Sequence, residues 1–205
     1  CTKLAHLYMS SNINDLIDSP IVKNSIPMKL SLNKDRLYSV SICDSVYSIP
    51  KFCFSQWKSL AYVKIPLSVT SIDEYAFYGC FNLKEITLHR KIETIGRSAF
   101  SNCVSLEKVI FESIDSLNEI NEYTFYNCTS LKEVTLPSCL KYIRSSAFQD
   151  CSSLQFVKFE KEELKLVSIE SYAFYNCNYL ERFPISPRVK TSNTTFPFFE
   201  FHKNI

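Results

Sequence analysis

Glycine is nearly absent from this sequence, which has two glycines among 205 residues, whereas proteins average about 7%. A glycine-rich loop that cradles phosphate groups therefore cannot be built. Basic and acidic residues nearly balance, and the formal net charge of +2 gives no electrostatic reason to expect nucleic acid or an anionic membrane as a partner. No apolar run approaches the roughly 18 residues of a transmembrane segment.

The usual signs of catalysis are missing as well. The three histidines, His6, His89 and His202, are far apart in the sequence. There is no G-x-S-x-G elbow, H-E-x-x-H pair or Walker loop. Carboxylates such as Glu85 and Glu107 are common surface residues. We therefore expect no enzyme activity, no cofactor, no metal and no small-molecule substrate.

Aromatic residues and cysteines are what the sequence has in number. It contains 16 Phe, 12 Tyr and 9 Cys, within a composition that is 46% hydrophobic and 21% charged. Such a composition is typical of a globular chain that can bury a core. FYNC occurs twice, and FYGC, FSNC and FQDC repeat its spacing of Phe to Cys. This recurrence indicates an internal repeat.

The five tetrapeptides belong to a longer pattern. Aligned on the Phe, they share apolar residues eight and five positions before it, and Cys, Leu and two apolar residues three, six, nine and eleven positions after it. Steps between successive Phe residues, from Phe54 onward, are 23, 23, 25, 23 and 26 residues. Trp57 takes the cysteine position in the unit of Phe54, and a weaker unit surrounds Ile21. In VTSIDEYAFYGCFNLKEITL the pattern is Val69, Ile72, Phe77, Cys80, Leu83, Ile86 and Leu88.

A period of about 23 residues with an L-x-x-Φ-x-Φ segment, where Φ is apolar, is typical of a leucine-rich-repeat solenoid. Alternation from Ile86 to Leu88 predicts a short strand, and the Ser, Asp, Glu or Asn before each Phe predicts a short helical turn. We therefore expect a repeat solenoid of the α/β type. It would be right-handed, with one parallel β-sheet face and short helical turns on the other.

The expected domain organisation is one continuous solenoid over residues 1–190. Its repeats are irregular over 1–45 and regular over 46–185, and residues 191–205 are predicted to form an aromatic C-terminal cap or tail, because open solenoid ends need covering. The irregular part contains a predicted hairpin insertion that pairs Leu30–Leu32 with Val40–Ile42.

The chain opens in the middle of a repeat, because Cys1, Leu4, Leu7 and Met9 fit the second half of a unit. We therefore expect a fragment of a longer array. The lack of a signal peptide at its start then says little about destination.

The motif I-x-x-x-A-F-x-x-C-x-x-L-x-x-V-x-L, as in IGRSAFSNCVSLEKVIF, resembles the BspA-like (Treponema-type) leucine-rich repeats. The resemblance covers residues 46–185 well and 1–45 loosely. Glycine, frequent in that family four residues before the Phe, is present here only as Gly96, and the proline after the strand only as Pro66 and Pro137. The resemblance implies binding of host proteins at a microbial cell surface.

The recurring cysteines follow the repeat period and should form one column along the solenoid. Zinc sites need clustered pairs such as C-x2-C, which are absent. Adjacent turns of the solenoid (rungs) lie about 4.8 Å apart, which is within the Cα–Cα range of a disulfide. Stacked side chains point in parallel, however, and five cysteines cannot all pair. We interpret the column as buried thiols that pack beside the Phe, with disulfides or a metal as alternatives. The column is Cys80, Cys103, Cys128, Cys151 and Cys177. The other cysteines lie outside this spacing or at its edge, and the pattern assigns them no role: Cys1, Cys43, Cys53 and Cys139.

One candidate binding surface is the concave face of the sheet. Lysine and glutamate alternate there along two columns, which either sets the strand register through weak opposite-charge pairs or, with exposed apolar neighbours, binds a partner. The candidates are Tyr62, Lys84, Glu85, Glu107, Lys108, Ile110, Lys132, Glu133, Phe156 and Lys158.

A second candidate surface is a tyrosine stripe on the turn side, where tyrosines flank every second Phe of the pattern. The intervening units carry Ser98 and Ser101, or Ser146 and Gln149. Two explanations stay open: alternation relieves crowding between bulky rings, or the stripe docks a partner. The tyrosine stripe is Tyr75, Tyr78, Tyr123, Tyr126, Tyr172 and Tyr175.

The expected function is protein–protein interaction with a partner that the sequence does not identify. By resemblance, the setting is a cell surface or the extracellular space, with an adhesin-like role. The alternative is a scaffold subunit of a large intracellular assembly, cytoskeletal or ciliary, because unpaired cysteines suit a reducing compartment. Two glycosylation sequons, Asn127-Cys-Thr and Asn193-Thr-Thr, favour the extracellular setting.

Overall fold

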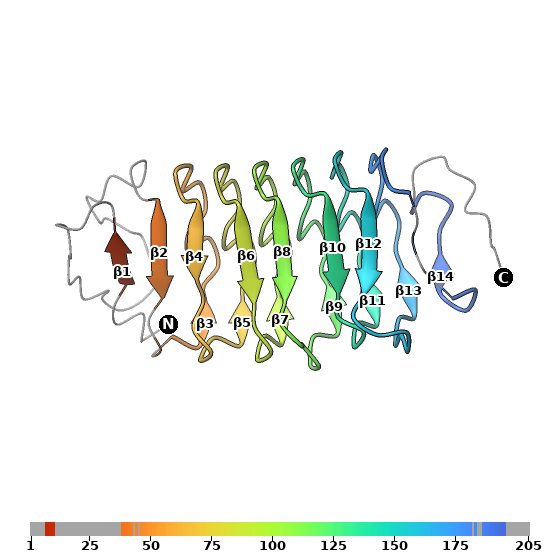
Figure 1. Cartoon of the computed structure of the whole chain (residues 1–205), viewed down its shortest axis with the longest axis horizontal. Coiled ribbons are helices and arrows are strands. Elements are labelled where there is room, and N and C mark those ends of the chain that lie inside the picture. Colours follow the sequence, from red (N-terminus) through yellow and green to blue (C-terminus); the bar gives the residue numbers. More distant parts are fainter. Residues whose placement is uncertain are drawn as a thin grey trace.

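The computed structural model describes residues 38–42, 44, 46–181, 183 and 186–195, and the backbone of Leu7–Ser10. The chain winds into an elongated solenoid whose turns stack side by side (Figure 1). The predicted leucine-rich-repeat fold with its parallel sheet is confirmed. It arises because each unit can bury its apolar residues only against the neighbouring units.

A seven-stranded sheet runs along one side of the solenoid in the order β1-β2-β4-β6-β8-β10-β12. All neighbouring strands are parallel except β1 and β2. Apolar and polar residues alternate in the parallel strands, so one face of that part of the sheet is buried and the other faces solvent. The strands are β1 (Leu7–Ser10), β2 (Ser39–Ile42), β4 (Tyr62–Lys64), β6 (Glu85–Leu88), β8 (Lys108–Phe111), β10 (Glu133–Leu136) and β12 (Phe156–Phe159).

Two-residue strands form two smaller parallel sheets, in the orders β3-β5-β7 and β14-β13-β11-β9. The sheets part between β7 and β9, in the unit where the Phe step lengthens to 25 residues. The strands are β3 (Ser48–Ile49), β5 (Ser71–Ile72), β7 (Thr94–Ile95), β9 (Glu119–Ile120), β11 (Tyr142–Ile143), β13 (Ser168–Ile169) and β14 (Lys190–Thr191).

A continuous stack of phenylalanine rings fills the core. Successive ring centroids are 5.0 to 5.5 Å apart and the ring planes are within 18° of parallel. Each ring is at most 1% exposed, so every unit adds one fully buried aromatic side chain to the same stack. The stack is Phe54, Phe77, Phe100, Phe125, Phe148 and Phe174.

The segment around each of these Phe residues forms successive reverse turns rather than a helix, and the described residues contain no helix. In one rung, Tyr78 N–H donates to the Tyr75 carbonyl within the turn (3.1 Å), whereas Phe77 N–H donates to Ala99 of the next rung (2.8 Å). Residues two before and two after the Phe have positive φ, for example Tyr75 at 57° and Gly79 at 68°. Left-handed residues cannot continue a right-handed helix.

These left-handed positions recur in every rung, although most of them are not glycine. Such a residue costs about 1–3 kcal/mol and persists when its surroundings fix it, as the hydrogen bonds between rungs do here. Before the Phe they are Phe52, Tyr75, Ser98, Tyr123, Ser146 and Tyr172, and after it Gln56, Gly79, Asn102, Asn127, Asp150 and Asn176.

Several predictions for the ends of the chain fall outside the described residues. These are the Leu30–Leu32 arm of the hairpin insertion and the aromatic segment 196–205. Strand β2 has β1 on one side, with Met9 opposite Val40, and β4 on the other, with Val63 opposite Val40. Both edges of β2 are therefore occupied by strands other than the predicted partner.

Candidate functional site

The outer face of the seven-stranded sheet, hereafter the sheet face, brings the first set of candidates together. The strand register places Tyr62 opposite Glu85, Glu85 opposite Lys108, Lys108 opposite Glu133, and Glu133 opposite Phe156. Just before the strands, Glu107 N–H donates to the Lys84 carbonyl at 2.8 Å. Most of these side chains are exposed, and Ile110 is half-buried, less open than the sequence predicts. The exposed ones are Tyr62, Lys84, Glu85, Glu107, Lys108, Lys132, Glu133, Phe156 and Lys158.

Charges on the sheet face are aligned but are for the most part not ion-paired. In the described part of the chain, the one ion pair on this face joins Lys158 Nζ and Glu133 Oε2 at 3.1 Å, and both side chains are about 60% exposed. Glu85 and Lys108 lie opposite each other on β6 and β8, yet no ion pair within 4 Å joins them. These hydrated charges remain available to charges on another molecule.

Aromatic side chains stand at both ends of the sheet face. Near β2, the rings of Tyr38 and Tyr62 meet edge to face at 5.3 Å, and their hydrogen bond raises the pKa of Tyr62. Near β12, Phe156 is exposed and Lys158 Nζ lies 5.8 Å from its ring centre. Tyr38 was missed by sequence reasoning because it precedes the regular repeats. The sequence did hold a signal for Tyr38, because this residue lies just before the alternating apolar residues Val40 and Ile42.

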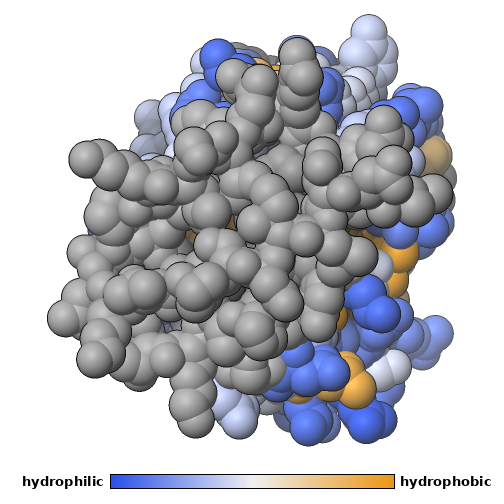
Figure 2. Space-filling model, turned by 90° about the vertical axis from the view of Figure 1, so that its left-hand side faces the viewer, coloured by the Kyte–Doolittle hydropathy of each residue, from blue (hydrophilic) through white to orange (hydrophobic). Residues whose placement is uncertain are grey.

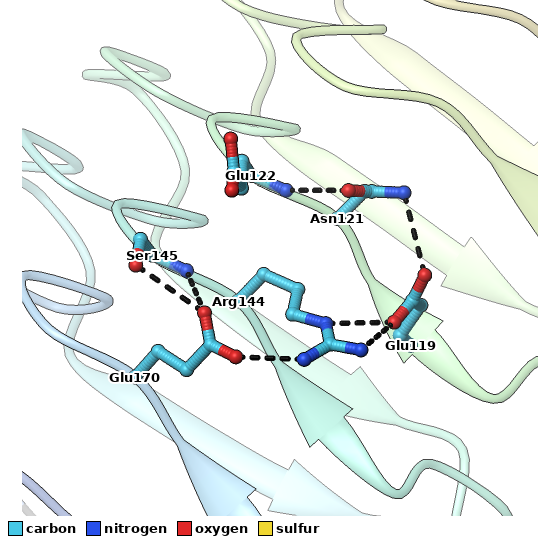
Figure 3. Close-up of polar contacts among 6 residues, drawn as sticks. All are labelled: Glu119, Asn121, Glu122, Arg144, Ser145 and Glu170. Carbon is cyan, nitrogen blue, oxygen red and sulfur yellow. Dashed lines mark hydrogen bonds and ion pairs between the residues drawn. The ribbon is translucent and has the colours of Figure 1, made fainter.

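Charges along the small sheets are, in contrast, joined to one another. Arg144 lies between two carboxylates: its Nη2 is 2.6 Å from Glu119 Oε2, and its Nη1 is 2.7 Å from Glu170 Oε1 (Figure 3). Glu170 also accepts hydrogen bonds from the N–H and hydroxyl of Ser145. These contacts, the Glu170 bond foremost, raise the pKa of Arg144. Arg97 with Glu122, and Lys51 with Glu74, make similar pairs between rungs.

A hollow of about 310 Å³ opens beside Gly96, where the small sheets part. An ideal Cβ on Gly96 would lie 2.5 Å from the Glu74 backbone nitrogen, so the close approach of two rungs requires glycine. Two of the lining carboxylates, Glu74 and Glu119, already pair with cations. In the described part of the chain, no group of three or more His, Cys, Asp or Glu side chains is arranged to hold a metal ion.

The tyrosine stripe forms three pairs, each within one rung. Ring centroids are 5.8 Å apart for Tyr75 and Tyr78, and the other two pairs, also edge to face, are at 5.7 and 5.5 Å. The rungs between have smaller or non-aromatic residues at these positions: Ser98, Ser101 and Ser146, which are at most 5% exposed, and the half-buried Gln149. Burial and the nearby Asp150 carboxylate raise the pKa of Tyr126. The other two pairs are Tyr123 with Tyr126 and Tyr172 with Tyr175.

Phe52 extends the tyrosine stripe toward the N-terminal end. Its ring stacks on that of Tyr75, one rung away, at 5.0 Å and 16°, and Lys51 Nζ lies 5.4 Å from its centre. Sequence reasoning missed Phe52, although it lies two residues before Phe54, as Tyr75 does before Phe77. The surface seen from this end is mostly hydrophilic where it is described, with small hydrophobic areas (Figure 2).

The cysteine column is packed in the core. Each column thiol donates a hydrogen bond to the carbonyl of the Phe one rung earlier, for example Cys80 Sγ to Phe54 O at 3.1 Å. Burial raises the pKa of Cys103 to about 12. The thiolate that nucleophilic or metal chemistry needs is therefore disfavoured. Cys53 is also buried, at the position where the later rungs have Ala or, once, Thr124. Cys139 is half-buried, with its thiol 3.1 Å from the Leu117 carbonyl.

The geometry defines a leucine-rich-repeat solenoid with two regular exposed surfaces, and such solenoids are generally non-catalytic binding folds. Residues 24–118 and 111–203 match the BspA type leucine-rich repeat region, in six copies. The chain belongs to this family, as its motif indicates. No curated protein sequence matches it.

One solved structure of a bacterial protein shares the fold, and two others align less closely. A leucine-rich repeat protein from Eubacterium ventriosum aligns with a TM-score of 0.69 and 23% identity, over 80% of this chain and 44% of that protein. This chain thus spans less than half the length of that relative. A leucine rich cell surface protein from Faecalibacterium prausnitzii has a TM-score of 0.44 and 21% identity, over 79% and 63% of the two chains. The leucine-rich repeat protein of T. pallidum has the same TM-score and identity, over 69% and 72%.

No helix in the described residues has the length and apolar character needed to cross a membrane.

Proposed function

We propose that this chain is a non-catalytic protein-binding module that holds its partner on the sheet face. The observation that carries the proposal is the contrast between two sets of charges. Arg144 is neutralised by Glu119 and Glu170, whereas Glu85 and Lys108 on the sheet face lie in register without an ion pair. Unpaired charges steer and orient a partner, and exposed aromatic residues serve as anchors.

We further propose that the whole protein works at a microbial cell surface as an adhesin-like protein. Membership of the BspA type family supports this setting. So does the sequon at Asn193, which lies exposed in a turn, whereas the Asn127 side chain donates to Asn102 Oδ1 at 2.8 Å. Within this proposal, residues 1–190 act as one solenoid and residues 191–205 close its end.

An intracellular scaffold is the second candidate, and the free cysteines favour it. Seven described cysteines carry no disulfide, as suits a reducing compartment. Intact mass of the protein from its native source, with thiol alkylation before and after reduction, separates the two. Glycan mass at Asn193 supports the surface setting, whereas no glycan and fully alkylatable thiols after unfolding, without reductant, support the scaffold.

Binding to intact host cells, measured by flow cytometry of the labelled chain, tests the sheet face. The test variant combines Tyr62→Ser, Lys108→Glu and Phe156→Ser. We expect it to lower cell binding at least tenfold while its circular dichroism spectrum and melting temperature stay close to those of the unaltered chain.

The matched control places three comparable changes away from the sheet face. It combines Tyr47→Ser, Lys141→Glu and Val167→Ser, all at exposed positions on or beside the small sheets. Cell binding by this control should equal that of the unaltered chain. Equal losses in the two folded triple variants would rule out the sheet face as the binding surface.

A further inference from the structure

Three successive rungs of the sheet face each carry a lysine and a glutamate side by side, hereafter the charged couples. Their order reverses from one rung to the next, so the face is a small checkerboard of opposite charges. All six side chains are exposed, and in the described part of the chain no ion pair joins the two members of any couple. The charged couples are Lys84 with Glu85, Glu107 with Lys108, and Lys132 with Glu133.

The phase of this checkerboard is not required by a single chain. Glu85, Lys108 and Glu133 lie opposite each other on adjacent strands, and alternation along that column already keeps like charges apart. Two columns in the same phase, with lysine beside lysine on one rung and glutamate beside glutamate on the next, would alternate equally well. The opposite phase adds a property that a single chain does not use, because it makes the face complementary to itself.

A two-fold axis that runs along the solenoid, between the two columns, exchanges the members of every couple. Lys84 of one copy then faces Glu85 of the other, and the same exchange on the next two rungs places every charge opposite its counter-charge. In an antiparallel pair centred on Lys108, that lysine would face itself and Glu85 would face Glu133. A shift of that pair by one rung would leave Glu133 opposite Tyr62. Charge complementarity therefore favours the parallel arrangement.

The rungs on either side of the charged couples fit the same axis. At β4, Tyr62 is 44% exposed and its neighbour Ala61 is buried, so the ring of one copy meets a position with no protruding side chain on the other. Tyr38 lies in the column of Ala61, whose N–H donates to the Tyr38 carbonyl at 2.8 Å, and its ring contacts that of Tyr62. The axis thus gathers both tyrosines of both copies into one aromatic cluster. At β12, the exposed Phe156 faces the half-buried Gln155.

We propose that the sheet face binds a second copy of this chain through a two-fold axis parallel to the solenoid. The proposal rests on the proposed function, since it takes the sheet face as the binding surface, and it names a partner for that surface. The two solenoids run in the same direction. This arrangement suits neighbouring copies on one cell surface rather than copies on two opposed cells.

The size of the patch sets the strength of the dimer. From the rung of Tyr38 to that of Phe156 the face spans five rung steps, about 24 Å at about 4.8 Å per rung, and it is two to three side chains wide. Such a patch offers less than the about 800 Å² per partner of a stable complex. We expect a dissociation constant of about 10 µM to 1 mM, which many copies held close together on one surface would exceed in local concentration.

Sedimentation velocity at chain concentrations from about 1 µM to 1 mM tests the proposal. We expect a monomer–dimer equilibrium whose dissociation constant rises at least tenfold in high salt. Lys84→Glu should also raise it at least tenfold, because two glutamates of each copy then face two of the other. The double variant Lys84→Glu with Glu85→Lys should restore it to about that of the unaltered chain, because the couple again has one acid and one base.

The double variant also tests the direction of the axis. In an antiparallel dimer shifted by one rung, Glu85→Lys would place a lysine opposite Lys108 and the dimer would stay weak. Lys141→Glu, an exposed position beside the small sheets, is the matched control and should dimerise as the unaltered chain does. Circular dichroism verifies that each variant is folded.

Three results would overturn the proposal. The first is a monomer at every concentration, and the second is a folded double variant whose dimerisation is not restored. The third is association beyond two copies, because a two-fold interface closes with the dimer.

Cell binding separates this inference from the proposed function. If the unaltered chain stays monomeric while the triple variant of the sheet face loses cell binding and its control does not, the inference fails and the proposed function stands. If the chain dimerises as expected while both triple variants bind host cells equally, the sheet face serves self-association, and the assignment of cell binding to it fails.

Discussion

The thiol of Cys103 donates a hydrogen bond to the carbonyl oxygen of Phe77, one rung earlier, at 3.3 Å. Four other thiols repeat this relationship, so each cysteine links its own rung to the previous one at the centre of the core. The contact explains the recurrence of cysteine three residues after the Phe: a small side chain fills the space, and its weak donor meets a buried carbonyl. The other four donors are Cys80, Cys128, Cys151 and Cys177.

Alkylation should separate the column thiols from Cys139. Burial raises the pKa of Cys103 to about 12, and only the thiolate reacts. In the folded chain at pH 7.5, iodoacetamide should modify the half-buried Cys139 well before Cys103, as read by peptide mass mapping. All thiols should react after unfolding in urea. Equal rates for Cys103 and Cys139 in the folded chain would show that the core opens readily.

Alkaline pH should destabilise the fold. The pKa values of Cys53 and Cys103 are raised to about 12 in the folded chain, whereas an unfolded cysteine titrates near 8.5. Between these values the unfolded chain loses thiol protons that the folded chain keeps. Stability is thus fully present below about pH 8.5, and between pH 8 and 10 it falls by about 2 kcal/mol for each such thiol.

Urea unfolding at pH 8, 9 and 10, followed by circular dichroism, measures this loss. Cys103→Ala should lower the stability at pH 8 but reduce its further loss up to pH 10 by about 2 kcal/mol, one thiol's share. An unchanged pH dependence in this variant would contradict a thiol origin.

Truncation of one stacked ring should be far more damaging than truncation of an exposed one. Phe100 is fully buried between Phe77 and Phe125, so Phe100→Ala should lower the free energy of unfolding by about 3–5 kcal/mol. Phe156→Ala, on the sheet face, is the matched control and should change it by about 0.5 kcal/mol or less. Similar urea midpoints for the two variants would mean that the stack contributes little.

Arg144→Met should lower the stability of the fold modestly, by an amount that depends on salt concentration. The side chain is 33% exposed and pairs with two carboxylates, so solvent screening limits the expected loss to about 1 kcal/mol. High salt should shrink the difference from the unaltered chain. Lys158→Met removes an ion pair whose side chains are about 60% exposed, and its melting temperature should hardly move. A larger loss for Lys158→Met would reverse this order.

The sequence period was enough to predict the parallel sheet, the strand positions and the buried columns. Val134 and Val157 lie opposite each other, and Phe77 and Cys80 are buried as the alignment requires. Repetition makes such predictions secure, because every unit buries the same positions against its neighbours.

Local backbone conformation was less predictable. Tyrosine and serine at Tyr75 and Ser98 give no sign of positive φ, because hydrogen bonds between rungs, rather than residue preference, hold them there. The residues after the Phe did carry a signal, since Gly79, Asn102 and Asn127 are types that accept the left-handed region. A short helical turn was expected at a place where these residues exclude a helix.

Charge alternation in the sequence identified columns but not ion pairs. Glu85 and Lys108 are aligned without an ion pair, whereas Arg144 reaches Glu119 and Glu170, 25 and 26 positions away. Their separation is one repeat, so the alignment could have brought them together. The direction of each long side chain, which decides the contact, is not encoded in the period.

The hydrogen bonds of the turns give the solenoid a polarity. On the turn side, Phe54 N–H donates forward to Ala76 and Phe77 N–H to Ala99, whereas beside the long sheet Lys84 N–H donates backward to Ala61. A cut between any two rungs would therefore leave two complementary surfaces. Where one surface has a row of N–H donors, the other has a row of carbonyl acceptors. Such surfaces rejoin only head to tail, so rungs can be duplicated or deleted by whole units while every remaining junction keeps its hydrogen bonds. Array length is thus free to vary without a new interface.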